Sequence, residues 1–424
     1  MRSRPAPAES APSRPRQPHP GVPVRLKDRF SAGLRIIGVS FFFVGLEKLL
    51  CILFTPGLVR ISLGAPSRKT ARRAEGVAQG WTAAPHLITR RDIVIVAAGR
   101  ILLRFTLAAC LGLQAATAGP YDPLAVVEAS KTPTLDLTVH DPGRNRDIPL
   151  RIYLPVGTTA APVVLYSHGL GGSRATNPFL GTHWSARGYV AVFMQHPGSD
   201  AEVWQDLPPR KRQAALKDAA NLANAIARFQ DVPAVIDQLA RWNQAADSPL
   251  SGRLDLARLG MSGHSFGAVT TQAVSGQGTP KGGAPYTDPR IRAALAMSPN
   301  SPRKGGDPRK LFGEVSIPWL LMTGTRDEAL IGDADLESRL AVYPALPPGG
   351  KYELVLEEAE HEAFGDRTLP GSKNPRNPNH HRAILALSTA FWDAWLRGDA
   401  EAKAWLDGAG PRSVLEAKDR WRRK

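Results

Sequence analysis

Apolar residues recur along the chain from residue 134 onward with two different periods. Residues 135–139 alternate between apolar and polar side chains, which is typical of a strand with one buried face. Apolar runs typical of buried strands follow at residues 148–154, 162–166, 189–194, 291–297, 317–322 and 352–356. Segments of helical period lie at residues 177–187, 208–245 and 384–395. Strands that alternate with helices predict an α/β fold, with a mostly parallel central sheet flanked by helices.

The longest helical segment, residues 208–245, is an insertion in this alternating pattern. Val235, Ile236 and Leu239 share one apolar face of it. Pro233 predicts the start of the second of two helices, because proline is favoured in the first turn of a helix. The two helices could cover a neighbouring pocket as a cap or pack as ordinary helices, and we favour the cap.

The net charge of +16 is distributed unevenly along the 424 residues. Residues 1–118 carry 18 lysines and arginines against 5 acidic residues, a net charge of +13. The remaining 306 residues carry 36 lysines and arginines against 33 acidic residues, a net charge of only +3. An evenly basic protein of this charge would be expected to bind nucleic acid or an anionic membrane. Because the basic excess belongs to the leader, we expect no nucleic-acid partner for residues 119–424.

The leader itself divides into two parts. Residues 1–90 are rich in proline and arginine. Their apolar stretch at 40–54 is interrupted by Glu47 and Lys48. This stretch is therefore shorter than the roughly 20 apolar residues that a membrane span needs. Residues 91–118 have the order of a secretory signal peptide, with a basic flank, an apolar run and an Ala116-Thr117-Ala118 cleavage site. We therefore predict a disordered leader or a mis-assigned start at 1–90, and a periplasmic or secreted bacterial protein.

Both cysteines, Cys51 and Cys110, lie in the leader. Cleavage after Ala118 would leave a protein without cysteine, and hence without disulfide or thiol chemistry. The stretch Leu107-Ala108-Ala109-Cys110 resembles a bacterial lipobox, so lipidation at Cys110 is an alternative to cleavage after Ala118. Membrane attachment is expected only through the signal peptide or this lipid.

The pentapeptide Gly263-His264-Ser265-Phe266-Gly267 is the strongest chemical motif in the chain. It follows an apolar run that contains Leu259 and Met261 and precedes a stretch of small residues with helical potential. A G-x-S-x-G motif between a strand and a helix lifts the serine hydroxyl out of the top of a sheet. The glycines are needed because the turn crowds the strand against the helix. We predict that Ser265 is a catalytic nucleophile.

A serine hydroxyl needs a base, and the base needs an orienting acid. Asp327 comes shortly after the predicted strand at 317–322, and His361 shortly after the strand at 352–356. Both therefore fall at the carboxyl ends of strands, where catalytic groups collect in such sheets. The chain order serine, acid, histidine matches that of the nucleophile-elbow enzymes. We predict Asp327 as the acid and His361 as the base.

Other residues near these positions are weaker candidates. The carboxylates that could replace Asp327 are Glu328, Asp333, Asp335 and Asp366. His380 and His381 fit the base less well, because they open the predicted closing helix. His196 either lines the pocket or simply ends its strand.

The tetrahedral intermediate of such a reaction needs backbone amides aimed at its oxyanion. One should be the amide of Phe266, directly after the nucleophile. The second should come from the glycine-rich loop after the strand at 162–166, where we favour Leu170. The ten histidines form no H-x-x-x-H motif or Cys/His cluster, so we expect neither a metal nor a cofactor.

Four motifs in order resemble the α/β-hydrolase superfamily over about residues 135–406. They are the Ser167-His168-Gly169-Leu170-Gly171-Gly172 run, the His196-Pro197-Gly198-Ser199-Asp200 segment, the Ser265 pentapeptide and the helix at 391–396. The chain is most similar to bacterial secreted dienelactone hydrolase-like and platelet-activating-factor acetylhydrolase-like serine esterases, which are related to polyester-hydrolysing cutinases.

The resemblance is weaker for the substrate than for the fold. True dienelactone hydrolases use a cysteine where this chain has Ser265. The acetylhydrolases share the GHSFG pentapeptide but place their acid after an earlier strand, and the stretch Met297-Ser298-Pro299-Asn300 offers no carboxylate there. This difference favours Asp327 and weakens a transfer of the phospholipid specificity.

Residues 119–424 are accordingly expected to form an α/β-hydrolase catalytic domain that cleaves carboxylic esters. Its substrate would be a small-molecule or lipid-like ester, bound without a cofactor. An acyltransferase, a peptidase or a lipase-like phospholipid acetylhydrolase would use the same machinery. A catalytically silent binding protein of the same fold is the alternative from another class. Acyl length and oligomeric state stay open.

Overall fold

The computed structural model describes residues 120–126, 133–302, 306–329, 331–332, 334–366 and 377–424. The predicted leader at 1–90, the predicted signal peptide at 91–118 and both cysteines lie outside these residues. Within the described part of the chain, no helix is both long and apolar enough to cross a membrane.

Nine strands of the described residues form one sheet in the order β1-β2-β4-β3-β5-β6-β7-β8-β9. Their bounds are β1 (Thr134–Asp141), β2 (Arg146–Tyr153), β3 (Ala161–Ser167), β4 (Val190–Met194), β5 (Leu254–His264), β6 (Ile291–Met297), β7 (Trp319–Arg326), β8 (Lys351–Glu360) and β9 (Arg420–Arg423). The six strands from β4 to β8 pair in parallel, whereas β1, β2 and β9 pair antiparallel to their neighbours. The predicted α/β fold with a mostly parallel sheet is therefore confirmed.

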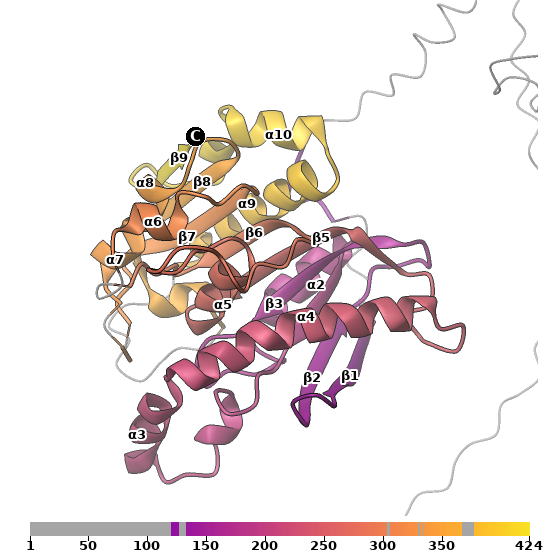
Figure 1. Cartoon of the computed structure of the whole chain (residues 1–424). Coiled ribbons are helices and arrows are strands. Elements are labelled where there is room, and N and C mark those ends of the chain that lie inside the picture. Colours follow the sequence, from indigo (N-terminus) through magenta and orange to yellow (C-terminus); the bar gives the residue numbers. More distant parts are fainter. Residues whose placement is uncertain (1–119, 127–132, 303–305, 330, 333, 367–376) are drawn as a thin grey trace, which may run out of the picture. The chain divides into compact units, whose positions relative to one another are not determined.

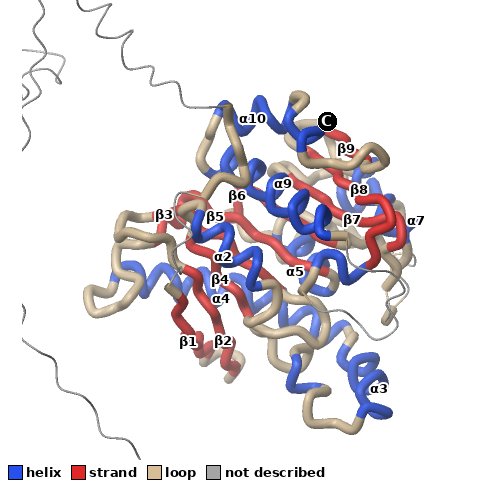
Figure 2. The backbone as a smooth tube through the Cα atoms, turned by 180° about the vertical axis from the view of Figure 1, so that it is seen from behind, coloured by secondary structure: helices blue, strands red, loops and turns tan. Residues whose placement is uncertain are grey.

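Helices cover both faces of the sheet (Figures 1 and 2). One face carries α4 (Leu222–Gln244), α5 (Phe266–Val274), α6 (Pro308–Phe312) and α8 (Val342–Ala345). The other carries α2 (Pro178–Ala186), α9 (Pro378–Leu396) and α10 (Ala400–Asp407). The remaining short elements are α3 (Pro209–Ala219), α7 (Leu336–Leu340) and the 3₁₀ turns η1 (Ala201–Val203), η2 (His361–Phe364) and η3 (Gly410–Ser413).

The central strands are apolar on both sides because both sides are covered. In β6, Ala293 and Leu295 face the α9 side, and Ala294 and Ala296 face the α5 side. All four are at most 1% exposed. A strand buried on both faces reads as a continuous apolar run instead of an alternating one. This explains why the inner strands stood out in the sequence as uninterrupted hydrophobic segments.

The insertion at 208–245 differs from its prediction in one respect. The break between its two helices falls at Ala220 and Asn221, and Pro233 lies inside α4. Asn221 begins the second helix because its side chain accepts a hydrogen bond from the amide of Asn224 at 2.9 Å. The prediction that Pro233 starts a helix is therefore wrong: an available N-cap outweighed the preference of proline for the first turn.

The two helices of the insertion also differ in role. The apolar face of α4, with Phe229, Val232, Val235 and Leu239, packs on the sheet as part of the core. Within α3 only Ala219 is buried, and Leu216 lines a pocket beside Ser265. The expected cap over the pocket is thus not formed by α4, which packs on the sheet. Of the two helices of the insertion, α3 is the one that contributes a side chain to the pocket.

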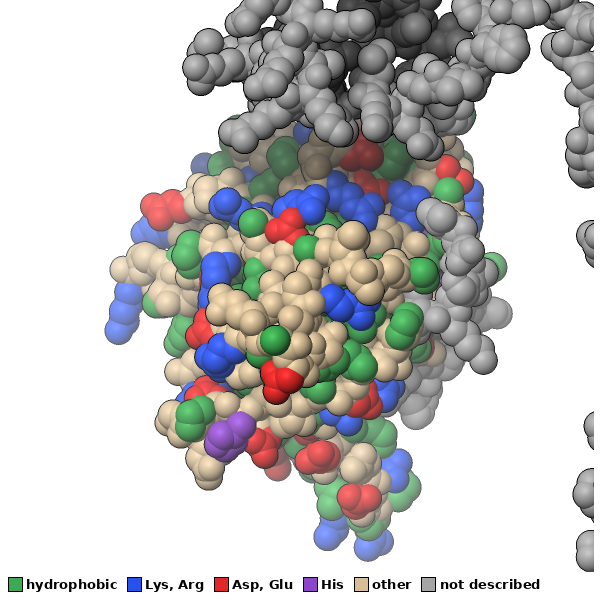
Figure 3. All heavy atoms as spheres, turned by 90° about the vertical axis from the view of Figure 1, so that its right-hand side faces the viewer, with side chains coloured by type: hydrophobic (Ala, Val, Ile, Leu, Met, Phe, Trp, Pro, Cys, Tyr) green, Lys and Arg blue, Asp and Glu red, His purple; other side chains and the backbone are tan. Residues whose placement is uncertain are grey.

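Basic and acidic side chains both occur across the part of the surface that Figure 3 shows in colour. They are interspersed with apolar and uncharged groups. This mixture agrees with the near-neutral charge of residues 119–424.

Candidate active site

Ser265 occupies the sharp turn between β5 and α5. Its backbone has φ 57° and ψ −115°, a conformation that a residue with a side chain rarely adopts. The surrounding structure fixes it, because the Ser265 amide donates to the Met297 carbonyl at 2.9 Å. A Cβ at Gly263 would lie 2.2 Å from the Gly267 carbonyl oxygen, and one at Gly267 would lie 1.9 Å from that of Ser167. Only glycine fits at either flank of the serine.

The structure brings Ser265, His361 and Asp327 into one hydrogen-bonded chain. The Nε2 atom of His361 lies 2.9 Å from Ser265 Oγ. Its Nδ1 atom lies 2.7 Å from Asp327 Oδ1. Because a carboxylate only accepts, Nδ1 carries the proton and Nε2 is free to accept the serine proton. These three residues come from the carboxyl ends of β5, β7 and β8.

Strands β7 and β8 extend farther than predicted and deliver two of these side chains. β7 continues through Arg326, so Asp327 is the residue directly after it. β8 continues through Glu360, so His361 is likewise the first residue past its strand. The strand ends therefore bring Asp327 and His361 within hydrogen-bonding distance of each other.

The Asp327 carboxylate is fully buried and has several donors around it. Its Oδ2 atom accepts a hydrogen bond from Thr323 Oγ1 at 2.8 Å. Its Oδ1 atom lies 3.0 Å from Nε of Arg339, a buried arginine of α7. Burial by itself would raise the pKa of Asp327, but His361 and Arg339 outweigh this effect and lower the pKa to about 2. Asp327 is thus ionised at neutral pH.

His264, the second residue of the pentapeptide, forms a hydrogen bond with the backbone of His361. Its Nε2–H donates to the His361 carbonyl at 3.1 Å. Burial, with the neighbouring His361 ring, lowers the pKa of His264 to about 3. His264 is therefore neutral at physiological pH and acts as a fixed donor.

The two predicted oxyanion donors lie close to the serine. Phe266 is the first residue of α5, where an amide has no acceptor inside the helix. Leu170 lies in the loop after β3, which is held by Gly171 N donating to Ser199 O at 2.9 Å and Gly172 N donating to Gly169 O at 3.0 Å. Among the described residues, the Leu170 amide has no backbone acceptor.

Ser265 lines two pockets. The His361-side pocket, of about 190 Å³, is also lined by Leu170, Leu216 and Glu362. The Phe266-side pocket, of about 390 Å³, is also lined by Leu170, Val269 and Arg339. Leu170 lines both pockets, as Ser265 does.

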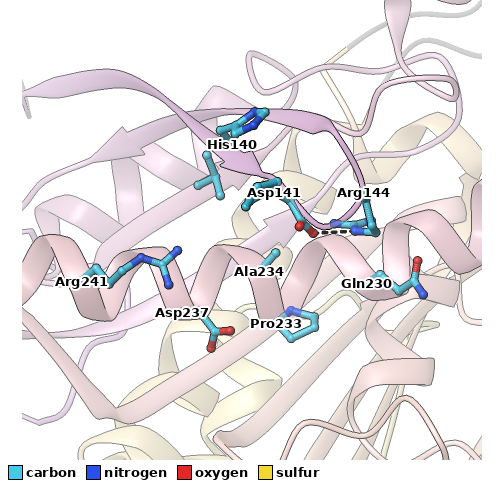
Figure 4. Close-up of a pocket in the computed structure, with 10 residues that line it drawn as sticks. His140, Asp141, Arg144, Gln230, Pro233, Ala234, Asp237 and Arg241 are labelled. Atoms are coloured by element: carbon cyan, nitrogen blue, oxygen red, sulfur yellow. Dashed lines mark hydrogen bonds and ion pairs between the residues drawn. The ribbon is translucent and has the colours of Figure 1, made fainter.

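A larger pocket, of about 740 Å³, lies elsewhere, between the β1–β2 hairpin and α4 (Figure 4). Its lining includes Asp141, Arg144, Asp237 and Arg241, and none of the candidate catalytic residues. Arg144 bonds Asp141 at 2.6 Å at its edge. The mixed and largely paired charges give this pocket no preference for a ligand of one sign.

The alternative acids and bases lie in other settings. Glu328 is exposed, and Asp335 caps α7 by accepting from the Ser338 amide at 3.0 Å. His380 donates to the Glu357 carbonyl and His381 to that of Gly365, both at 3.1 Å. Asp366 lines the His361-side pocket, and Asp333 lies outside the described residues.

Two buried arginines near the site were missed from the sequence. Arg339 lies in a short polar segment, and no feature of the surrounding sequence distinguishes it from a surface residue. Arg228 lies on α4, four residues after Asn224 and three before Asp231, and both it and Asp231 are 0% exposed. Their spacing of three residues on one helix face was the only available hint.

The arrangement has the parts of nucleophilic catalysis by a serine. In the described part of the chain, no group of three or more histidine, cysteine or acidic side chains could hold a metal ion. Neither a protein-family model nor a curated protein matches this chain. Its function has to be inferred from the geometry of Ser265, His361 and Asp327.

Proposed function

We propose that residues 119–424 form an α/β-hydrolase-fold serine hydrolase that cleaves carboxylic esters. The observation that carries this proposal is the chain of contacts from Ser265 through His361 to Asp327, with spacings of 2.9 and 2.7 Å, beside two pockets. The strand-turn-helix setting of Ser265 and the chain order serine, acid, histidine support the fold assignment.

In the first half of the reaction, His361 Nε2 takes the proton of Ser265 Oγ as the oxygen attacks the ester carbonyl. Asp327 holds the imidazole in the required tautomer and stabilises its charged form. The Phe266 and Leu170 amides bind the oxyanion of the tetrahedral intermediate. His361 then protonates the leaving alcohol, and the acyl group stays on Ser265.

In the second half, water enters in place of the alcohol and His361 removes its proton. The water oxygen attacks the acyl carbonyl, the bond from the acyl carbon to Ser265 Oγ breaks, and His361 Nε2 returns the proton to Oγ as the carboxylic acid leaves. Because the alcohol oxygen must receive its proton from Nε2, the alcohol part of the ester belongs in the His361-side pocket. The acyl part then extends into the Phe266-side pocket, along Val269.

The test uses a fluorophosphonate probe and p-nitrophenyl esters of increasing acyl length, with a p-nitroanilide as the amide control. We expect wild-type protein to be labelled and to hydrolyse the esters, and Ser265→Ala to do neither. Ser251→Ala, a substitution in the turn before β5, should behave like wild type. An unlabelled, inactive wild-type protein would instead indicate a binding protein without catalysis.

The proposed enzyme acts in the periplasm or outside the cell, in line with the signal peptide predicted at 91–118. Detection of the native amino terminus by mass spectrometry tests this. A terminus at Gly119 would support export, and peptides from residues 1–85 in the native host would contradict a downstream start.

A further inference from the structure

A second Ser-His-Asp chain lies behind the loop that carries Leu170. Ser167 Oγ lies 2.9 Å from His196 Nε2. His196 Nδ1 lies 2.9 Å from Asp231 Oδ2. All three side chains are 0% exposed. No substrate can reach this serine, so the array has a role other than nucleophilic catalysis.

The hydrogen bonds fix the protonation of this array. Asp231 accepts from His196 Nδ1–H, which leaves Nε2 to accept the proton of Ser167. Burial, together with the charge of Arg228, lowers the pKa of His196 to about 4. The His196 ring is therefore neutral at physiological pH.

The same array reaches the loop of Leu170 through His168. The backbone amide of His196 donates to His168 Nε2 at 3.1 Å. His168 must then carry its proton on Nδ1, which lies 2.6 Å from the Gly169 carbonyl oxygen. The carbonyl just before Leu170 is thereby tied, through His168, to the segment that follows β4.

Two arginines form ion pairs with Asp231, and a third, Arg228, lies near it on α4. Arg144 and Arg146 each contact its Oδ1 atom at 2.8 Å from the β1–β2 side. Arg144 also lines the larger pocket that Figure 4 shows. Arg228 lies one turn before Asp231 on α4, and both residues are fully buried.

Arg228 contacts the segments on both sides of the predicted oxyanion hole. Its Nη1 atom donates to the His168 carbonyl at 2.7 Å, and its Nε atom donates to Ser199 Oγ at 2.8 Å. Ser199 in turn accepts from the Gly171 amide through its carbonyl. The guanidinium carbon lies 4.3 Å from the centre of the Phe266 ring. One side chain thus touches the Leu170 loop and the first residue of α5.

We propose that Arg228 is a positioning residue that sets the distance and angle between the Leu170 and Phe266 amides. This inference rests on the proposed hydrolase function. It also gives α4 a role in catalysis, because the insertion helix anchors the oxyanion hole.

The energetics favour such a role over simple space filling. A fully buried charge costs several kcal/mol unless it is paired and hydrogen-bonded. A leucine or methionine would fill the same volume without this cost. Only a planar guanidinium can donate to a carbonyl and a hydroxyl in its plane and stack on an aromatic ring with its face.

The experiment compares Arg228→Lys and Arg228→Met with wild type in kcat, KM and inhibition by a boronic acid. A boronic acid forms a tetrahedral adduct with the serine and so reports on the oxyanion hole. A hole misplaced by a fraction of an ångström should lower kcat about 10- to 100-fold, leave KM within about twofold and weaken the boronic acid in proportion to kcat/KM. Arg241→Met, an exposed position on the same helix, is the matched control and should leave all three unchanged.

The outcomes separate this inference from the proposed function. Suppose that the wild type is active and that Arg228→Met has unchanged kcat and boronic-acid affinity. This result overturns the role of Arg228 and leaves the proposed hydrolase function standing. An inactive wild type overturns the proposed hydrolase and this inference with it. If neither Arg228 variant folds, Phe266→Leu decides, because it keeps the amide and removes the ring beneath the guanidinium. A roughly tenfold loss of kcat is expected there, and an unchanged kcat overturns the proposal.

Discussion

Arg339 and Asp327 form a buried ion pair inside the candidate active site, with Nε of the arginine 3.0 Å from Oδ1 of the aspartate. The same Oδ1 atom lies 2.7 Å from His361 Nδ1. Arg339 also donates to the carbonyls of Asp327 at 2.7 Å and of Ser298 at 2.9 Å. It therefore ties the loops after β6 and β7 to α7. The proposed acid is held by the Arg339 cation as well as by the neutral histidine.

Replacement of Arg339 by methionine should destabilise the fold by about 3 kcal/mol, because it leaves Asp327 as a buried charge with fewer partners. Urea unfolding at neutral pH measures this loss. In an Asp327→Asn background the same replacement should cost less, since no carboxylate is left to compensate. Equal costs in the two backgrounds would show that the ion pair contributes nothing beyond packing.

Asp327→Asn should reduce kcat about 10⁴-fold and leave KM nearly unchanged, because an amide can stabilise the wrong tautomer of His361. Steady-state kinetics on the best p-nitrophenyl ester measures this effect. The adjacent Glu328→Gln is the matched control and should keep wild-type activity, since Glu328 is exposed. A large loss of activity in Glu328→Gln, together with an active Asp327→Asn, would show that Asp327 is not the acid.

The strand pattern and the three residues of the candidate site could be predicted because each has a local signature. Buried parallel strands leave apolar runs, and their carboxyl ends point to the same edge of the sheet. Ser265, Asp327 and His361 each follow such a run, so the topology alone brings them together. The short antiparallel strand β9 was not predicted, because its sequence Arg420-Trp421-Arg422-Arg423 is too charged to read as a strand.

The supporting residues could not be predicted for a physical reason. Arg228 and Arg339 are buried only because partners distant in sequence, such as His168 and Asp327, surround them. Within a few positions of either arginine, the spacing of Arg228 and Asp231 on one helix face is the only hint of burial. Pro233 illustrates the opposite error, since a local preference was outweighed by the capping of Asn221 and by the packing of α4 on the sheet.

Gly267→Ala should abolish labelling by the fluorophosphonate probe and destabilise the protein by about 3 kcal/mol or more. The added Cβ would lie 1.9 Å from the Ser167 carbonyl oxygen, so β3 and α5 would have to move apart at the serine. Gly143→Ala is the control, because its Cβ meets nothing closer than 3.4 Å. Retention of both stability and labelling in Gly267→Ala would contradict the crowded turn described for Ser265.

The stability contributed by Asp327 should depend on pH in a defined window. Its pKa in the folded protein is about 2, against an ordinary value of 3.8. A carboxyl whose pKa is lowered by folding stabilises the protein above its unfolded pKa, and this stabilisation is lost as the pH falls through the folded pKa. The shift corresponds to about 2 kcal/mol, present above about pH 4 and fading towards about pH 2.

Asp231 also has a lowered pKa and contributes in the same acidic range, through its contacts with His196 and Arg146 that outweigh its burial. The contribution of Asp327 is therefore read from the difference in unfolding free energy between wild type and Asp327→Asn, measured in urea from about pH 6 down to about pH 2.5. This difference should shrink as the pH falls, because protonation of the wild-type carboxyl makes it resemble the amide. A difference that stays constant over the range would mean that Asp327 is not held as a buried carboxylate by His361 and Arg339.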